Sequence, residues 1–146
     1  MTSKRTKIIV DILMTVFLAL SFVRWEAANF AFHAIVGVGC TLFFSMHVFI
    51  HRKWIKAMTK SCFDGKLNPM LKWRYVVDML LLVFWSISIV TGFVAIIPFL
   101  SNPEAASFWG SIHGVTARIG LGLVVVHVVQ HWPQIKSYLG IKKRVA

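Results

Sequence analysis

The hydrophobic residues of this chain gather in four long runs separated by short polar stretches. The runs cover about residues 8–25, 29–51, 73–97 and 108–132, each near the ~20 residues that a helix needs to cross the ~30 Å hydrocarbon core of a bilayer. The first run begins like a signal peptide, but no small-residue cleavage pair follows it, so we expect it to remain as a span. We expect Pro98 and Pro133 to end the last two helices, because proline cannot continue a helix ladder. The pattern predicts an all-α, integral membrane four-helix bundle that forms a single domain over residues 1–146.

The composition is typical of a membrane protein, and the distribution of basic residues predicts its orientation in the membrane. Hydrophobic residues make up 58% of the chain and charged residues 14%, whereas a soluble domain usually carries about 25% charged residues. The net charge of +11 invites a nucleic-acid partner, but all basic residues except Arg24 and Arg118 lie before the first run, around the connection between the second and third, and after the fourth. They are Lys4, Arg5, Lys7, Arg52, Lys53, Lys56, Lys60, Lys66, Lys72, Arg74, Lys136, Lys142, Lys143 and Arg144. This alternation follows the positive-inside rule and predicts contact with lipid headgroups, both termini in the cytoplasm and no nucleic-acid partner.

The six histidines form two matching triplets inside the second and fourth runs. The spacing H-x13-H-x3-H occurs in both, and adding 80 to each number of the first triplet gives the second. The triplets are His33, His47 and His51, and His113, His127 and His131. Fourteen helical positions return to within about 40° of the same face and rise about 21 Å. Because spans two and four run in the same direction, we expect His33 level with His113 on the outer side and His47 level with His127 on the inner side.

Facing imidazoles at two depths are suited to axial ligation of two b-type haems, since neutral imidazole is a strong ligand of haem iron. Buried polar residues bonded to neighbouring carbonyls are the simpler interpretation, and for one lone histidine it would be preferred. Ionisable residues inside a membrane are functional candidates, and two matching triplets favour ligation. No CxxCH motif occurs, so covalent c-type attachment is excluded.

His51 and His131 lie one turn beyond His47 and His127, which leaves the inner ligand pair open. One turn is about 5.4 Å, too little for a third stacked haem. We prefer His47 and His127, because ligation by His51 and His131 would place the two haems about 27 Å apart along the helices and move the inner one into the headgroups. The remaining pair could contact haem propionates or a quinone, relay protons, or simply face the headgroups.

Small and charged residues near the histidines extend the prediction. Gly120, midway between His113 and His127, and Gly37 could let a flat haem approach the helix backbone, although small residues also serve helix contacts without a cofactor. Arg118 is the one cation deep in a span, and it could pair with a propionate of the outer haem or with a neighbouring helix or headgroup. Asp11 and Asp78 could accept protons from a quinol, or act only as helix-entry carboxylates.

These motifs resemble those of the flavinylation-associated cytochromes, small prokaryotic four-span b-type cytochromes. The resemblance is carried by His33-x3-Gly37, His47-x3-His51, Thr91-Gly92, His113 and His127-x3-His131-Trp132. It implies a protein of the prokaryotic inner membrane that transfers electrons between the quinone pool or a cytoplasmic-side donor and a separate extracytoplasmic partner, often flavin-bearing. It also implies that His33, His47, His113 and His127 are the haem ligands.

The leading functional hypothesis is therefore transmembrane electron transfer through two bis-histidine haems, with quinol oxidation at the inner side as an additional activity left open. A histidine-lined transition-metal transporter is the alternative from another class, because imidazole also binds zinc, copper and iron. It predicts acidic ligands and broken helices along the path, and the interiors of spans two and four hold no carboxylate and no proline. A membrane anchor subunit without cofactor is the third hypothesis.

Overall fold

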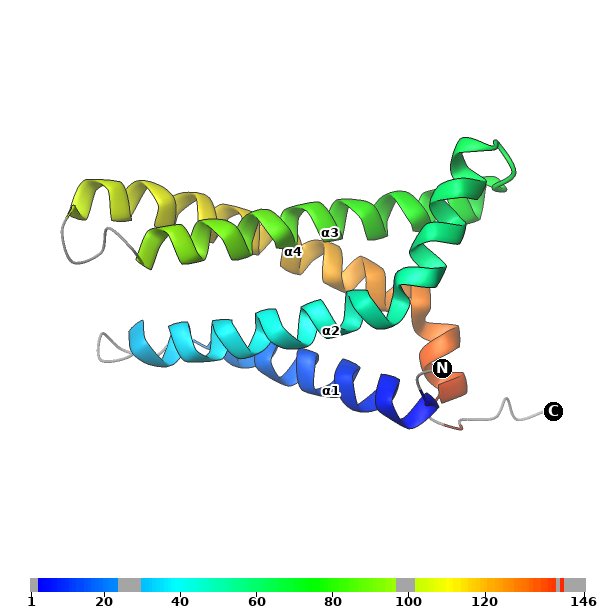
Figure 1. Ribbon diagram of the computed structural model, residues 1–146, viewed down its shortest axis with the longest axis horizontal. Coiled ribbons are helices and arrows are strands. Elements are labelled where there is room, and N and C mark those ends of the chain that lie inside the picture. Colours follow the sequence, from blue (N-terminus) through cyan, green and yellow to red (C-terminus); the bar gives the residue numbers. More distant parts are fainter. Residues whose placement is uncertain (1–2, 24–29, 97–101, 139, 141–146) are drawn as a thin grey trace. The chain divides into compact units, whose positions relative to one another are not determined.

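A computed structural model describes residues 3–23, 30–96, 102–138 and 140. The regular structure of this part of the chain is helical (Figure 1), in four helices: α1 Lys4–Ser21, α2 Phe30–Phe63, α3 Pro69–Ile96 and α4 Pro103–Tyr138. The chain divides into two compact units, Met1–Lys60 and Ser61–Ala146. The first unit holds α1 and most of α2, and the second holds α3 and α4. The predicted all-α class is confirmed, whereas one four-helix bundle over a single domain stays a prediction.

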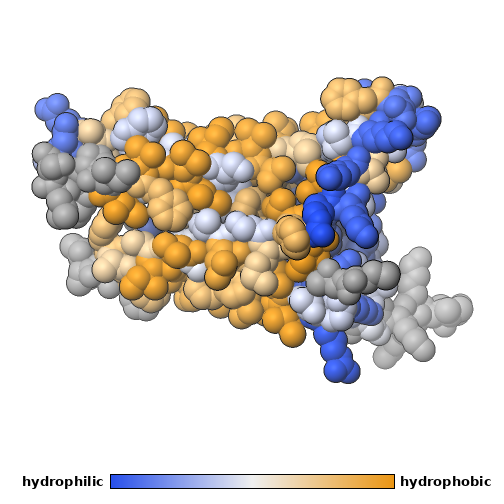
Figure 2. Space-filling view, in the orientation of Figure 1, coloured by the Kyte–Doolittle hydropathy of each residue, from blue (hydrophilic) through white to orange (hydrophobic). Residues whose placement is uncertain are grey.

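Three helices of the described residues, α2, α3 and α4, are long and apolar enough to cross a membrane. Even α3, with 28 residues, is about 42 Å long and exceeds the ~30 Å hydrocarbon core. Hydrophobic side chains cover the middle of the helices, and hydrophilic ones gather where α2 ends and α3 begins (Figure 2). The shorter α1 has 18 residues and begins with basic ones, so its role as a fourth span stays a prediction. The span ends predicted at Trp25, Asn29 and Ile97 lie outside the described residues.

The helices α3 and α4 begin earlier than the apolar runs, because an Asn-Pro pair starts each one. The side-chain oxygen of the asparagine accepts a hydrogen bond from the backbone N–H three residues on, at 2.8 Å for Asn68 and 3.1 Å for Asn102. This is the N-cap contact that satisfies one of the unpaired donors of a first helical turn. The proline that follows is well suited to the first helical position, where its missing N–H costs nothing.

A glycine follows the end of α2, and a proline lies within the last turns of α4. Gly65 has a φ of +67°, a left-handed conformation that glycine adopts without steric cost, and its N–H bonds to the Cys62 carbonyl as α2 ends. The prediction that Pro133 ends the last helix is wrong, since α4 continues through it to Tyr138. Proline removes one backbone hydrogen bond and favours a kink, and helix-compatible residues on both sides can carry the helix past it.

The first unit is held together by small and aromatic residues between α1 and α2. The ring of Phe17 lies against the backbone of α2 at Gly39, so closely that a Cβ there would overlap it. The same ring packs on Phe43, with 5.2 Å between the centroids. Val10 and Cys40 are buried at 3% and 5% exposure. The absence of a side chain at Gly39 thus sets how closely the two helices approach.

The second unit is held by a similar contact between α3 and α4. The indole of Trp85 on α3 lies over Gly120 on α4, 3.0 Å from where a Cβ would be. The hydroxyls of Thr91 and Thr116 are buried in this unit and each donates to the carbonyl four residues back on its own helix, at 2.8 Å. Hydroxyl groups paired in this way can be buried in lipid or between helices without an unsatisfied donor.

Candidate metal-ligating sites

All six histidines lie on α2 and α4, as the sequence predicts. His33, His47 and His51 belong to α2, and His113, His127 and His131 belong to α4. Within each helix the last two rings are neighbours across one turn, with centroids 4.6 Å apart in both units. The i,i+4 spacing therefore brings two imidazoles together in each unit, as helix geometry requires.

In the first unit, His47 is oriented by a carboxylate from α1. Its Nδ1 lies 2.7 Å from Oδ1 of Asp11, with the His47 side chain 22% exposed and that of Asp11 38% exposed. A carboxylate accepts hydrogen bonds, so the Nδ1–H of His47 donates. Asp11, His47 and His51 also form a group whose potential ligand atoms lie within 4.8 Å of one another.

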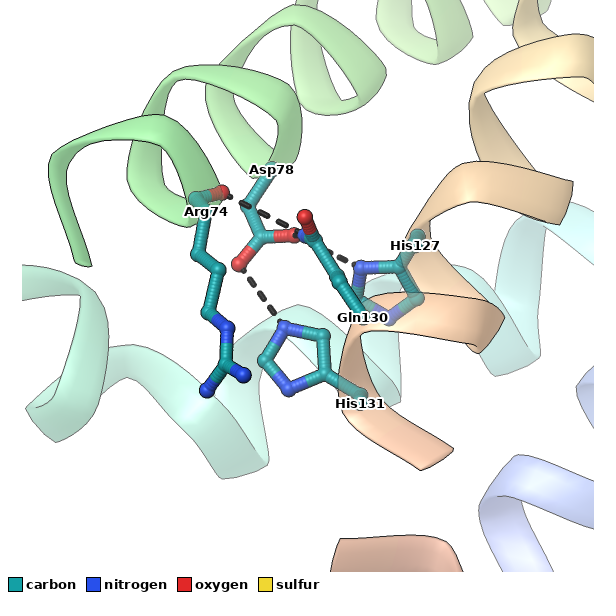
Figure 3. A network of polar contacts seen from close by, with 5 residues as sticks. All are labelled: Arg74, Asp78, His127, Gln130 and His131. Atoms are coloured by element: carbon teal, nitrogen blue, oxygen red, sulfur yellow. Dashed lines mark hydrogen bonds and ion pairs between the residues drawn. The ribbon is translucent and has the colours of Figure 1, made fainter. Parts of the chain in front are cut away.

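The second unit repeats this contact between α3 and α4 (Figure 3). The Nδ1 of His127 donates to Oδ1 of Asp78 at 2.7 Å, and the Asp78 side chain is only 8% exposed. Its other oxygen, Oδ2, accepts from the Nε2 of His131 at 3.1 Å. Asp78, His127 and His131 form the second group with ligand atoms within 4.8 Å of one another. Asp78 thus ties together both histidines of one helical turn.

Gln130 completes the network around Asp78. Its Nε2 donates to Oδ1 of Asp78 at 2.7 Å, and to the backbone carbonyl of Arg74 at 3.4 Å. Figure 3 shows the Gln130, His127 and His131 side chains converging from α4 on the Asp78 carboxylate. The Oε1 of Gln130 is buried, and it has no hydrogen-bond partner among the described residues.

His113, near the other end of α4, is oriented by a neutral group. Its Nδ1 lies 2.8 Å from the backbone carbonyl of Ser88 on α3 and 3.3 Å from the Ser88 hydroxyl. The carbonyl can only accept, so Nδ1–H donates here as well. Gly92 lies against the same ring, since a Cβ at this position would be 2.9 Å from Nδ1 of His113.

These contacts select one tautomer for three of the four predicted haem ligands. In neutral imidazole one nitrogen carries the proton and the other carries the lone pair. His47, His113 and His127 donate through Nδ1, so their lone pair is on Nε2, the nitrogen far from the backbone. Among the described residues, nothing hydrogen-bonds Nε2 of His47 or His127. His131 donates through Nε2 instead, which leaves its lone pair on Nδ1, beside its own Cβ.

The other predicted site residues fall in different surroundings. His33 lies on an exposed part of α2. Arg118 is exposed, and its Nε donates to the Gly114 carbonyl of its own helix at 2.9 Å. Gly37 has open space where a Cβ would be. Gly120 is buried against an indole ring, so its smallness serves the contact of α3 with α4, and its role beside a haem stays a prediction.

The sequence located the carboxylates but not their partners. Asp11 and Asp78 were expected to receive protons from a quinol or to mark helix entries, and the structure places each against a histidine of the next helix. Gln130 and Ser88 could not be singled out from the sequence, because neither is ionisable and neither belongs to the repeated histidine spacing. The predicted facing of His33 with His113, and of His47 with His127, joins residues of two different units and stays a prediction.

The fold and these sites define a class: an all-helical chain with membrane-spanning capacity and two histidine–carboxylate clusters. Neither a scan against protein-family models nor searches of curated proteins and of solved structures find a match to this chain.

Proposed function

We propose that the protein transfers electrons across the prokaryotic inner membrane through two b-type haems held by histidine pairs. The inner haem takes His47 and His127, and the outer haem takes His33 and His113. Electrons pass between the quinone pool or a cytoplasmic-side donor and a separate extracytoplasmic redox protein, as the resemblance to flavinylation-associated cytochromes implies. Both termini lie in the cytoplasm in this proposal.

One observation carries the proposal: in both units, the first histidine of the H-x3-H pair donates its Nδ1–H to an aspartate of the preceding helix. The N···O distance is 2.7 Å for His47 with Asp11 and for His127 with Asp78. Metal-ligating histidines almost always donate their second ring N–H to a carboxylate or a carbonyl, which fixes the ring and the tautomer. The two contacts support the proposal, because they leave the lone pair of both imidazoles on Nε2, the nitrogen that would bind iron.

The donor set suits haem in its chemistry as well as in its orientation. His113 makes the equivalent contact with a backbone carbonyl at 2.8 Å, the other common partner of a ligating imidazole. Bound haem would supply reversible one-electron chemistry of iron, tuned by axial ligands and burial. The chain's own residues would hold the iron, fix the ring planes and keep the cofactor inside the apolar part of the helices.

The tautomers also favour His127 over His131 as the inner ligand. Nε2 of His131 is engaged by Asp78 at 3.1 Å, so ligation would have to use Nδ1. That nitrogen is next to Cβ, where the backbone of the helix obstructs the approach of a flat porphyrin. His131, and by analogy His51, are then left to contact propionates or a quinone.

A reduced-minus-oxidised absorption spectrum of purified protein tests the proposal directly. Protein made in haem-sufficient cells should show a b-type α-band and about two haems per chain, as bis-histidine ligation at two depths requires. His47→Ala and His127→Ala should each remove the same haem, because each deletes one of its two axial ligands. The matched substitutions one turn away, His51→Ala and His131→Ala, should retain both haems. Absence of haem from the wild-type protein refutes the proposal.

A bound transition-metal ion is the second candidate, favoured by the two groups of one aspartate and two histidines. Its geometry is less suitable. Two ligands of a tetrahedral zinc ion, each about 2.0–2.1 Å from the metal, lie about 3.3 Å apart, whereas Nδ1 of His127 and Oδ1 of Asp78 are 2.7 Å apart. That shorter distance is a hydrogen bond with a proton between the atoms. Metal analysis of the same preparations separates the candidates, since a metal triad requires His51 and His131 and the haem pair does not.

A further inference from the structure

Three of the four proposed haem ligands, His47, His127 and His113, are oriented by groups that differ in charge. At the inner level, His47 and His127 both donate to carboxylates, Asp11 and Asp78. At the outer level, His113 donates to the neutral backbone carbonyl of Ser88. The difference is built from contacts inside each unit.

We infer that Asp11 and Asp78 are positioning residues that lower the reduction potential of the inner haem below that of the outer haem. This inference rests on the proposed function, since it presumes that haem binds. A carboxylate that accepts the Nδ1–H bond increases the basicity of the imidazole, and a more basic ligand stabilises the oxidised iron. A neutral carbonyl has the same orienting effect with less transfer of negative charge to the ring.

The order of the two reduction potentials sets the direction of electron transfer through the protein. Electrons run from the low-potential centre to the high-potential one, so they pass from the inner haem to the outer one. Under the proposed topology the inner level is the cytoplasmic side, near the basic connection between α2 and α3. The chain would therefore export electrons to an extracytoplasmic acceptor rather than import them.

Replacing each aspartate with asparagine tests the inference by potentiometric titration of the α-band. Asp11→Asn and Asp78→Asn each keep the size of the side chain and remove the charge. Each variant should raise the midpoint potential of the lower-potential haem, and only of that haem. We expect at least a tenfold change in its reduction equilibrium, which is 59 mV for one electron. The matched control is Asp64→Asn, which removes a carboxylate that pairs with Lys66 at 3.2 Å and belongs to neither of the two histidine–aspartate groups.

The outcomes separate this inference from the function on which it rests. Wild-type protein without haem refutes both. If two haems are present and their potentials in Asp11→Asn and Asp78→Asn equal those in Asp64→Asn, only the inference is refuted. It is also refuted if the two asparagine variants shift the potentials of two different haems. Loss of the lower-potential haem in both asparagine variants, restored by Asp11→Glu and Asp78→Glu, supports the inference because glutamate keeps the carboxylate acceptor. Loss that glutamate does not restore refutes it.

Discussion

The substitution Gly92→Ala, which adds a single methyl group, tests the packing around His113. A Cβ on this residue would lie 2.9 Å from Nδ1 and 3.1 Å from Cε1 of the His113 ring, both well inside ordinary van der Waals contact. The ring is rigid, and the same Nδ1 donates to the Ser88 carbonyl at 2.8 Å. Gly92→Ala should therefore turn the ring away and break that hydrogen bond.

The expected cost can be worked from these two effects. Overpacking of a tight contact costs about 1–3 kcal/mol, and loss of the hydrogen bond about 0.5–1.5 kcal/mol more. Alanine also gains about 1 kcal/mol of helix propensity, which is why the control is Gly122→Ala, a helical glycine of the same unit with open space at its Cβ. The free energy of unfolding of Gly92→Ala should be about 1.5–4.5 kcal/mol lower than that of this control.

Unfolding of both variants by sodium dodecyl sulfate in mixed micelles measures the difference. The haem spectrum gives a second reading, because the loss of an outer-shell partner typically weakens metal binding by about 10–100-fold. Gly92→Ala should therefore lose the haem of His113 before the other one. A stability within about 0.5 kcal/mol of Gly122→Ala, the range of ordinary surface substitutions, together with two retained haems, would show that the contact does not constrain the ring.

Two further substitutions test the first unit and the outer haem. Gly39→Ala should destabilise the packing of α1 on α2 by about 1–3 kcal/mol, because Phe17 occupies the space that the methyl group needs. The control is Gly37→Ala, which has open space at its Cβ in the same helix and should show no such loss in the same micelle assay. If the guanidinium of Arg118 turns from its own helix to a propionate, Arg118→Gln should lower the midpoint potential of the outer haem alone, because a nearby cation favours the reduced form. Unchanged potentials would limit Arg118 to its contact with the Gly114 carbonyl.

The helices could be predicted from the sequence because their causes are local. Long apolar runs and the 3.6-residue period placed every histidine on α2 or α4, as the structure confirms. The helix starts were missed because the apolar runs begin several residues after the capping pairs at Asn68 and Asn102. The helix end predicted at Pro133 was wrong because a proline removes only one backbone hydrogen bond, and the residues beyond it continue α4 to Tyr138.

The partners of the histidines could not be predicted, because they depend on how two helices pack. Asp11 and His47 are separated by 36 positions, and Asp78 and His127 by 49. An ionisable residue in a membrane helix is expected to have a partner, but the sequence does not say which residue comes within reach. Gly120 is a second example. Its position in the sequence predicted a place beside a haem, whereas its contact with the indole of Trp85 depends on how α3 and α4 pack.

The recurrence of one contact in two units is the strongest argument that it serves ligation. The histidines repeat at an offset of 80 positions and the aspartates at 67. The aspartate and the histidine are therefore 36 positions apart in one unit and 49 in the other, while the hydrogen bond keeps the same atoms and the same 2.7 Å length. A merely stabilising polar pair has no need to repeat its atoms, and the two aspartates otherwise differ in exposure and in their further partners. What the two contacts share is the orientation of an imidazole with its lone pair on Nε2, and that is what an axial ligand of iron requires.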